Sequence, residues 1–266
     1  MKVPIEQESM KKAVNQSFQE MGVRPGDAVL IHTGFRAFGF PGTAQQRAAQ
    51  ALGLWQAIQH FLTPHGSLLV PALSHEYVGY YNPVFHELAT RSCVGYLAEL
   101  FRTECSEKRS LCPTHSVCGW GSHLDYYLGS HQQDHSPAGP SSPYSLLRDP
   151  KEGQRSWIIF LGCSPRSNTS MHGVEELLEP DYLFDGTMDC LVIDRNDGVI
   201  HTNIKLHGFR AMEQRYDRLL TILPPKYVRT ARLFMADCYA LPVQQVWNYG
   251  YKALERDPWF FVQPRG

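Results

Sequence analysis

The run of residues 168–175, NTSMHGVE, offers the clearest candidate for chemistry. Thr169, His172 and Glu175 are spaced three apart, so on a helix they share one face. A carboxylate beside an imidazole fixes the tautomer of the ring and stabilises its protonated form, which suits His172 to act as a general base. Free N–H groups at the start of such a helix would face a developing oxyanion. The simpler interpretation is a helix capped by Thr169, with His172 and Glu175 as a surface pair.

A second candidate is the loop of residues 32–39, HTGFRAFG, which follows a short apolar run. The backbone N–H groups around Thr33, Gly34 and Gly39, together with the guanidinium of Arg36, suit a phosphate group. The loop is not a P-loop, because it lacks the Gly-Lys-Ser/Thr ending. The alternative is an ordinary connection between a strand and a helix.

Two further polar segments, residues 109–117 and 131–143, are weaker signals, because loops are commonly polar. Serine hydrolase chemistry would need a G-x-S-x-G elbow, which the chain lacks. A zinc site lacks ligand-pair spacing, so no metal is expected. A metal-dependent hydrolase stays open as a competing hypothesis, with ligands drawn from His115, His131 and His172.

The elements that must position these residues follow from apolar patterning. Short apolar runs at 28–31, 67–71 and 156–161 are typical of buried strands. Helices are expected at 43–61, with Thr43 as N-cap, and at 169–178. This strand–helix–strand order predicts an α/β fold with a mixed, largely parallel sheet covered by helices. Ligands bind at the carboxyl ends of strands in such sheets, which is where both candidate segments lie.

The remaining segments predict further helices, a short strand, a hairpin and one long irregular loop. No repeat or linker divides the chain, so residues 1–266 are expected to form a single domain. The helices are expected at 6–21, 92–103, 208–220 and 243–255, the strand at 115–119, the hairpin at 189–194 with 199–204, and the loop at 130–143.

Composition excludes several classes of protein. The chain is 43% hydrophobic, and its 25 Lys and Arg nearly balance 26 Asp and Glu, which excludes a disordered polyelectrolyte. A net charge of −1 gives no global field for nucleic acid or an anionic membrane. No apolar stretch approaches the roughly 20 residues of a spanning helix. The seven Cys include no C-x-x-C pair, which favours reduced thiols and a cytoplasmic location.

Taken in order, these segments resemble the aminoglycoside 3-N-acetyltransferase family. The family's motifs are matched by His32, Arg36 and Gly39; by residues 109–117; by His131, Asp134 and residues 139–143; and by Leu161-Gly162 followed by Asn168, Thr169, His172 and Glu175. The resemblance covers nearly the whole chain. It implies an α/β fold of this family's own type, distinct from GCN5-like acetyltransferases.

The resemblance also implies an activity and roles for residues. Acetyl-CoA would be the cosubstrate, and a small-molecule amine, with the 3-amino group of an aminoglycoside among the candidates, would attack it directly in a ternary complex. His172 would be the base, Glu175 would orient it, and Thr169 would face the thioester oxygen. The CoA path would be lined by His32, Thr33, Gly34, Arg36, Arg109 and Ser110, and the amine would meet Glu76, Asp185 and Glu213.

Some alternatives stay open beside that activity. A catalytically inactive CoA-binding module on the same fold would keep the donor pocket, and the assembly could be a homodimer. The chain departs from the family pattern at Gly34, where a Ser is common, at Cys112, where a His precedes Pro, and at Phe234-Met235. A polycationic aminoglycoside prefers a strongly acidic pocket, so the near-zero net charge favours a smaller amine.

Overall fold

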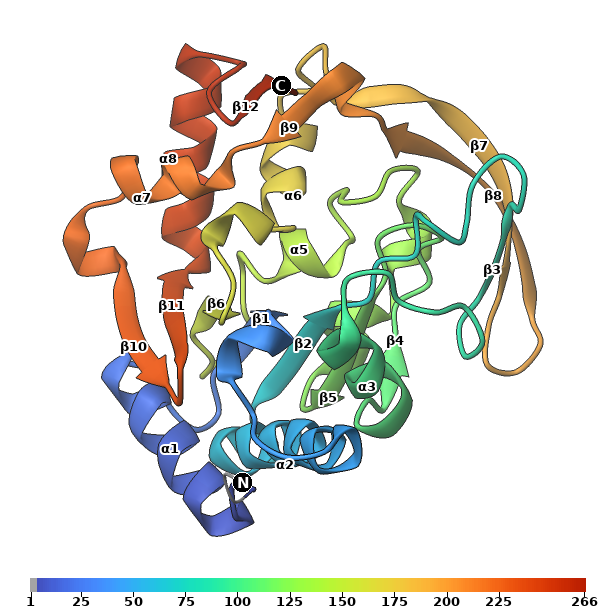
Figure 1. The fold of residues 1–266 in the computed structure, drawn as a ribbon. Helices are drawn as coiled ribbons and strands as arrows, with labels where there is room; N and C mark the ends of the chain where they lie inside the picture. The colour runs from blue at the N-terminus through green and yellow to red at the C-terminus, as the bar shows by residue number, and fades with distance from the viewer. Residues whose placement is uncertain (1–3) are drawn as a thin grey trace.

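A seven-stranded mixed sheet forms the centre of the computed structural model, which describes residues 4–266 and every side chain in that range except that of Arg210 (Figure 1). The strand order is β10-β11-β6-β1-β2-β5-β4. The strands are β1 (Ala28–Thr33), β2 (Ser67–Pro71), β4 (Lys108–Arg109), β5 (Val117–Gly121), β6 (Ser156–Leu161), β10 (Arg229–Leu233) and β11 (Ala236–Pro242). The sheet is mixed, as expected, but it is not largely parallel: only β6, β1 and β2 pair in parallel, and the other four neighbouring pairs are antiparallel.

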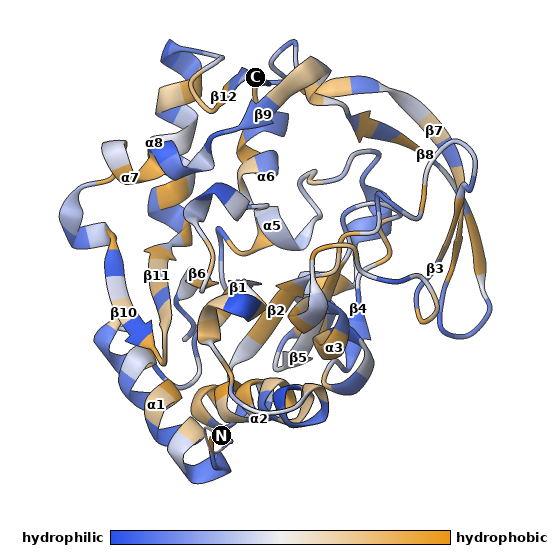
Figure 2. Cartoon of the chain, viewed as in Figure 1, coloured by the Kyte–Doolittle hydropathy of each residue, from blue (hydrophilic) through white to orange (hydrophobic). Residues whose placement is uncertain are grey.

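Alternating side chains of the central strands supply two separate cores. Val29 and Ile31 of β1 pack into one core, whereas Ala28 and Leu30 pack into the other. This period of two places all four residues of Ala28–Ile31 in one core or the other, because successive side chains of a strand point to opposite faces. Figure 2 shows β2 and β11 as mainly hydrophobic, whereas β10 at the edge of the sheet is largely hydrophilic.

Helices cover both faces of the sheet. One core is closed by α1 (Gln7–Glu20), α2 (Ala44–Leu62) and α3 (Tyr96–Glu104). The other is closed by α4 (Leu124–Leu128), α5 (Pro143–Leu146), α6 (Met171–Glu176), α7 (Leu219–Ile222) and α8 (Val243–Arg256). The N-cap predicted for α2 is confirmed: the Thr43 hydroxyl accepts from the N–H of Gln46 in a complete capping box.

Two small sheets lie outside the main one. The predicted hairpin is confirmed and is longer than expected, and it arches away from the body of the molecule with β3 alongside (Figure 1). Its strands are β7 (Phe184–Ile193) and β8 (Val199–His207), and β3 spans Val84–His86. The other small sheet pairs β9 (Met212–Gln214) with β12 (Val262–Pro264) near the C-terminus.

The helix expected at 208–220 is wrong. The segment instead contains the 3-10 turn η4 (Phe209–Ala211), then β9, the turn η5 (Tyr216–Arg218) and the short helix α7. Phe209 and Ala211 both have positive φ, which breaks a right-handed helix at its start. The helix expected at 92–103 begins at Tyr96, and that expected at 169–178 is confined to Met171–Glu176.

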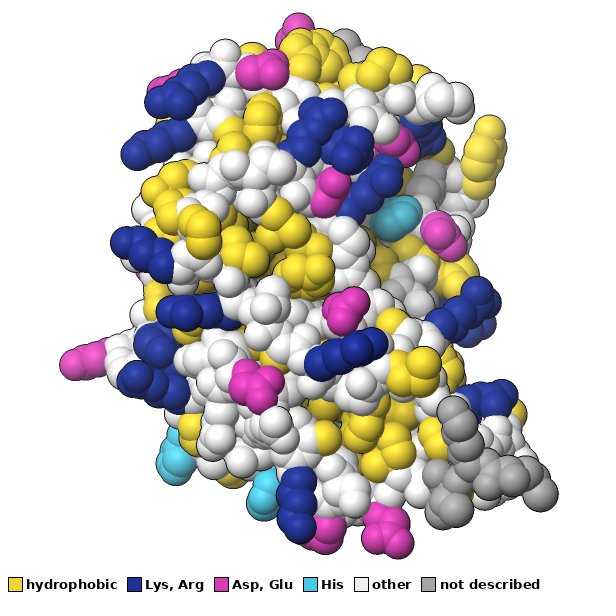
Figure 3. All heavy atoms as spheres, turned by 60° about the vertical axis from the view of Figure 1, so that its left-hand side comes forward, with side chains coloured by type: hydrophobic (Ala, Val, Ile, Leu, Met, Phe, Trp, Pro, Cys, Tyr) yellow, Lys and Arg dark blue, Asp and Glu magenta, His cyan; other side chains and the backbone are white. Residues whose placement is uncertain are grey.

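The face turned forward in Figure 3 shows Lys and Arg side chains interspersed with acidic and hydrophobic ones, without a continuous basic surface. Within residues 4–266, no helix has both the length and the apolar composition needed to cross a membrane.

Candidate active site

Parallel pairing of β1 and β6 brings the two candidate segments together. His32 and Thr33 lie opposite the last two residues of β6, so both strands end at one edge of the sheet. The chain leaving β6 then turns into α6 beside the end of β1. There the N–H of Thr169 donates to Nε2 of His32 at 3.1 Å, and the Thr169 hydroxyl lies 3.2 Å from the same nitrogen.

Glu175 lies at the centre of a buried hydrogen-bond cluster. Its carboxylate lies 3.2 Å from Nδ1 of His172 and accepts from the hydroxyls of Tyr216 at 2.7 Å and Tyr182 at 2.9 Å. Glu175 has no exposed surface and His172 is 6% exposed, so the interpretation as a surface pair is wrong. A carboxylate only accepts, so the proton on this side of the ring sits on Nδ1 and Nε2 presents a lone pair.

The two tyrosines were missed by the sequence reasoning. Tyr182 precedes β7 and Tyr216 lies in η5, so neither falls within a motif that contains the histidine. Burial, together with the nearby charge of Glu175, raises the pKa of Tyr216 well above its ordinary value, so its hydroxyl stays a donor. Nothing in the local sequence around either tyrosine indicates this contact.

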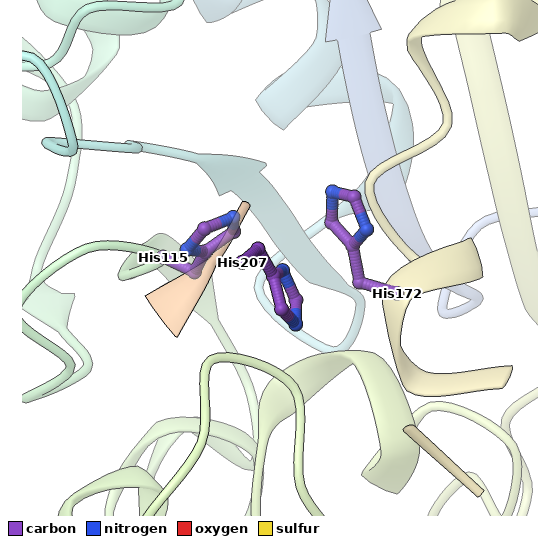
Figure 4. Close-up of side chains that lie close together, drawn as sticks. All are labelled: His115, His172 and His207. Carbon is purple, nitrogen blue, oxygen red and sulfur yellow. The ribbon is translucent and has the colours of Figure 1, made fainter. Parts of the chain in front are cut away.

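His172 also borders a cavity of about 510 Å³. Three more histidines line it, and His115 and His207 lie with His172 in one group (Figure 4). Burial, and then the charge of neighbouring histidines, lowers the pKa of His115 and of His207 well below the ordinary value, so both rings are neutral near pH 7. The cavity is lined by Leu73, His75, Val78, Gly79, Thr114, His115, His172, Leu206, His207, Gly208, Phe209, Gln214 and Arg265.

A second cavity, of about 240 Å³, lies at the carboxyl ends of β1 and β2. It includes His32, Thr33 and Thr169, and the rest of its lining is mostly apolar: Ile31, Val70, Pro71, Leu73, Val94, Ala98 and Ser167. Leu73 lines both cavities, so the two spaces adjoin. Burial lowers the pKa of His32 to about 3, which keeps this ring neutral.

The N–H groups expected to face an oxyanion are already paired. The N–H of Thr169 donates to His32, and that of Ser170 donates to the side-chain oxygen of Asn168. Those of Met171 and His172 donate to backbone carbonyls within the same turn. The hydroxyl of Thr169 is therefore the polar group of this turn that the structure brings to the second cavity.

Arg109 and Ser110 do not line either cavity. The guanidinium of Arg109 donates to the Ser116 hydroxyl and to the carbonyls of Ala72, Glu87 and Thr90. Ser110 accepts from the N–H of Val117, and its hydroxyl lies 2.8 Å from Nδ1 of His131. The structure thus gives both residues contacts that hold the sheet edge and its loops together.

The loop after β1 places Arg36 in solvent. Its side chain is exposed and makes no hydrogen bond or ion pair within the described part of the chain. Gly34, one turn earlier, approaches the loop after β6, and a Cβ at this position would lie 2.1 Å from the carbonyl oxygen of Gly162. The departure from the serine common in the family therefore has a steric reason here.

Replacing Gly34 with serine is expected to lower stability by at least ~2 kcal/mol, because two backbone segments would have to separate. Chemical denaturation measures the change. Gly79→Ala is the matched control, since a Cβ there meets nothing within 4 Å, and its midpoint should stay close to that of the parent. Equal midpoints for both variants would contradict the close approach.

The three acidic residues expected to meet the amine lie outside the 510 Å³ cavity. Glu76 and Asp185 are exposed. Glu213 pairs with Arg166 at 2.7 Å and accepts from Gln263. The residues lining the cavity include no aspartate or glutamate.

Comparison with known proteins relates this chain to a single family. Residues 30–255 match the family model of aminoglycoside 3-N-acetyltransferase. A curated relative, the SPbeta prophage-derived aminoglycoside N(3')-acetyltransferase-like protein YokD of Bacillus subtilis, is 24% identical over 185 residues. That alignment covers 62% of this chain and 64% of YokD, which is less than two thirds of the relative's length.

Solved structures share the fold over nearly the whole chain. YokD superposes with a TM-score of 0.75 at 20% identity, covering 93% of this chain and 94% of its own. Aminoglycoside acetyltransferase AAC(3)-IVa gives 0.73 at 20% identity (96% and 91%), and AAC-IIIb in a binary complex with CoASH gives 0.72 at 18% (98% and 99%). The chain belongs to the aminoglycoside 3-N-acetyltransferase family, a family of acyltransferases. The expected family and fold are confirmed.

Proposed function

We propose that the protein is an acetyl-CoA-dependent N-acetyltransferase in which His172 is the general base. The observation that carries the proposal is the buried pair of His172 and Glu175, whose imidazole lines the larger of two cavities that share Leu73. The pair fixes the proton on Nδ1 and leaves the lone pair of Nε2 to accept a proton. Membership of an acetyltransferase family gives the reaction class.

The acetyl donor fits the smaller cavity. Its mostly apolar walls and the hydroxyls of Thr33 and Thr169 suit the pantetheine arm and thioester, and its position at strand ends is where ligands bind in such sheets. AAC-IIIb, a structural relative, was solved with CoASH. Acetyl-CoA supplies the acetyl group as a thioester, and transfer releases free CoA.

The protein's own residues remove a proton from the amine and hold the two substrates in position. An amine at pH 7 is mostly ammonium and attacks only after losing a proton. His172 takes a proton from the amine, and Glu175 stabilises the imidazolium that results. The C–N bond forms as the C–S bond breaks, so no protein nucleophile is needed. Holding the two substrates in adjoining cavities supplies proximity.

The larger cavity suits an amine of low charge. Its lining holds four histidines and Arg265 and no carboxylate, and a polycation gains little there. AAC(3)-IVa, a structural relative, was solved in complex with apramycin. Aminoglycosides are therefore the comparison arm of the test, and small monoamines are the expected acceptors.

The test measures turnover with a panel of amines that includes aminoglycosides and small monoamines, using the release of free thiol as the signal. Binding of acetyl-CoA is measured separately by calorimetry. Acetyl-CoA binding with transfer to a monoamine supports the proposal. Binding without transfer to any amine would leave a CoA-binding module, and absence of both would overturn the proposal.

Arg36→Ala is expected to weaken CoA binding by about 3–10-fold, because an exposed guanidinium next to the donor cavity is free to meet a phosphate. Arg109→Met should instead cost about 3 kcal/mol of stability by leaving the carbonyls of Glu87 and Thr90 without their donor and removing one donor from that of Ala72. Calorimetry and denaturation separate the two effects. A larger CoA defect in a folded Arg109→Met than in Arg36→Ala would reverse the assignment.

A further inference from the structure

Three imidazoles in the larger cavity come from distant parts of the chain. His115 precedes β5, His172 lies in α6, and His207 ends β8. Their ring centroids are separated by 4.7 to 5.3 Å, and one nitrogen of each lies within 4.8 Å of the others (Figure 4). Such a group of imidazoles is unusual for a cavity meant only to receive a protonated amine, because none of them offers a negative charge.

Each ring is already held by its other nitrogen. Nδ1 of His172 faces the carboxylate of Glu175 at 3.2 Å, and Nε2 of His207 faces the carboxylate of Glu176 at 2.7 Å. Nδ1 of His115 lies 2.9 Å from the hydroxyl of Thr114. The carboxylate–histidine pair is the arrangement that orients histidines bound to metal ions and raises their basicity.

The nitrogen left over on each ring is free. Among the described residues, Nε2 of His115 and Nε2 of His172 have no hydrogen bond, and Nδ1 of His207 is buried with no partner at all. A buried polar atom without a partner costs free energy, so the structure indicates that something absent from the chain itself satisfies it.

We propose that His115, His172 and His207 bind a divalent transition-metal ion of the zinc class and that an ion bound there switches off acetyl transfer. Three histidines with a fourth position open to the cavity are a known zinc-binding set, and imidazole suits zinc, cobalt, nickel and copper. At Zn–N distances near 2.0–2.1 Å the ligand nitrogens of a tetrahedral site lie about 3.3 Å apart, so the rings close on the ion by side-chain rotation.

The inhibitory half of this proposal rests on the proposed function. An ion on Nε2 of His172 occupies the lone pair that would accept the proton of the amine. Metal binding and base catalysis then compete for one nitrogen, and the affinity of the site sets the zinc concentration at which transfer stops.

The direct measurement is titration of the tag-free, metal-stripped full chain with Co²⁺ at about pH 8, because metal affinity falls when the ligands are protonated. One equivalent should produce the visible absorption of four-coordinate cobalt, and one equivalent of zinc should bleach it. His115→Ala and His207→Ala should each weaken Co²⁺ binding at least about 100-fold, and Glu176→Gln about 10–100-fold.

Two controls separate this site from other metal binding. Cys93→Ser disables an exposed group formed with His75 and Glu76, and His65→Ala removes an exposed histidine elsewhere. Both should keep the parent affinity. Unchanged melting temperatures across the panel show that the variants fold. No cobalt spectrum, or a spectrum that His207→Ala leaves intact while Cys93→Ser removes it, would overturn the site.

Activity is read separately. Acetyl transfer is followed as the fall in thioester absorbance. Zinc should stop this fall, and excess EDTA should restore acetyl transfer. If the enzyme transfers acetyl groups and zinc at saturation leaves the rate unchanged, the inhibitory half is overturned while the cobalt spectrum still decides the site. If no amine is acetylated, the proposed function fails and the spectrum is unaffected by that result.

Discussion

Replacing His172 with alanine is expected to lower kcat by at least about 100-fold while the Kd for acetyl-CoA changes by less than about twofold. The ring lines the larger cavity and is not among the residues that line the smaller one, where the donor is proposed to bind. Removing the base therefore affects the proton transfer more than the binding of the thioester. Steady-state kinetics with the best amine of the panel and calorimetry with acetyl-CoA measure the two quantities.

His65→Ala is the matched control for this variant, since His65 is exposed and lies outside both cavities. It should keep parent kinetics. A His172→Ala enzyme with the parent kcat would exclude His172 as the base, whereas a parallel loss of CoA binding would show that the ring supports the donor cavity instead.

Glu175→Gln is expected to lower kcat by about 10–100-fold and to cost about 1–3 kcal/mol of stability. The carboxylate accepts from two tyrosine hydroxyls and faces Nδ1 of His172. An amide keeps the shape, but its NH₂ group would confront a donor at one of these contacts. It also removes the negative charge that stabilises the imidazolium formed during transfer. Kinetics together with thermal melting measure both effects.

The two tyrosines supply matched comparisons. Among the described residues, the hydroxyl that Tyr182→Phe removes donates to Glu175 alone. The hydroxyl that Tyr216→Phe removes lies near both Glu175 and Nδ1 of His172. We expect both to lose stability and Tyr216→Phe to lose more kcat. If Glu175→Gln destabilised the fold and left kcat unchanged, Glu175 would be structural alone.

The local sequence pattern was enough to predict the strands and the helix that position His172 and Glu175. The apolar runs of β1 and β6 are buried on both faces, and a short buried run of this kind is a strong strand signal. Thr43 and Gln46 form a capping box three residues apart, which is readable from sequence alone. His172 and Glu175 were identified from their own spacing because one helical turn brings them together.

Contacts between distant segments were not predictable in the same way. Tyr216 lies 41 residues beyond Glu175, in a segment expected to be helical and instead broken by positive φ at Phe209 and Ala211. His207 ends a hairpin strand whose extension was underestimated. The burial of Arg109 was not predictable from the sequence either. Its guanidinium could bind a phosphate, but in the structure it donates to the protein's own carbonyls.

The sharing of Leu73 by two cavities has an evolutionary consequence. The smaller cavity is lined largely by residues at the ends of β1 and β2. The larger cavity draws on the segment after β2, on Thr114, His115 and His172, and on the end of β8, η4, β9 and Arg265. Substitutions in β8, η4 and β9 would change the lining of the larger cavity, and none of these elements lines the smaller one. Over evolution, substitutions in β8, η4 and β9 can thus alter the larger cavity while the strands that line the smaller cavity keep their sequence.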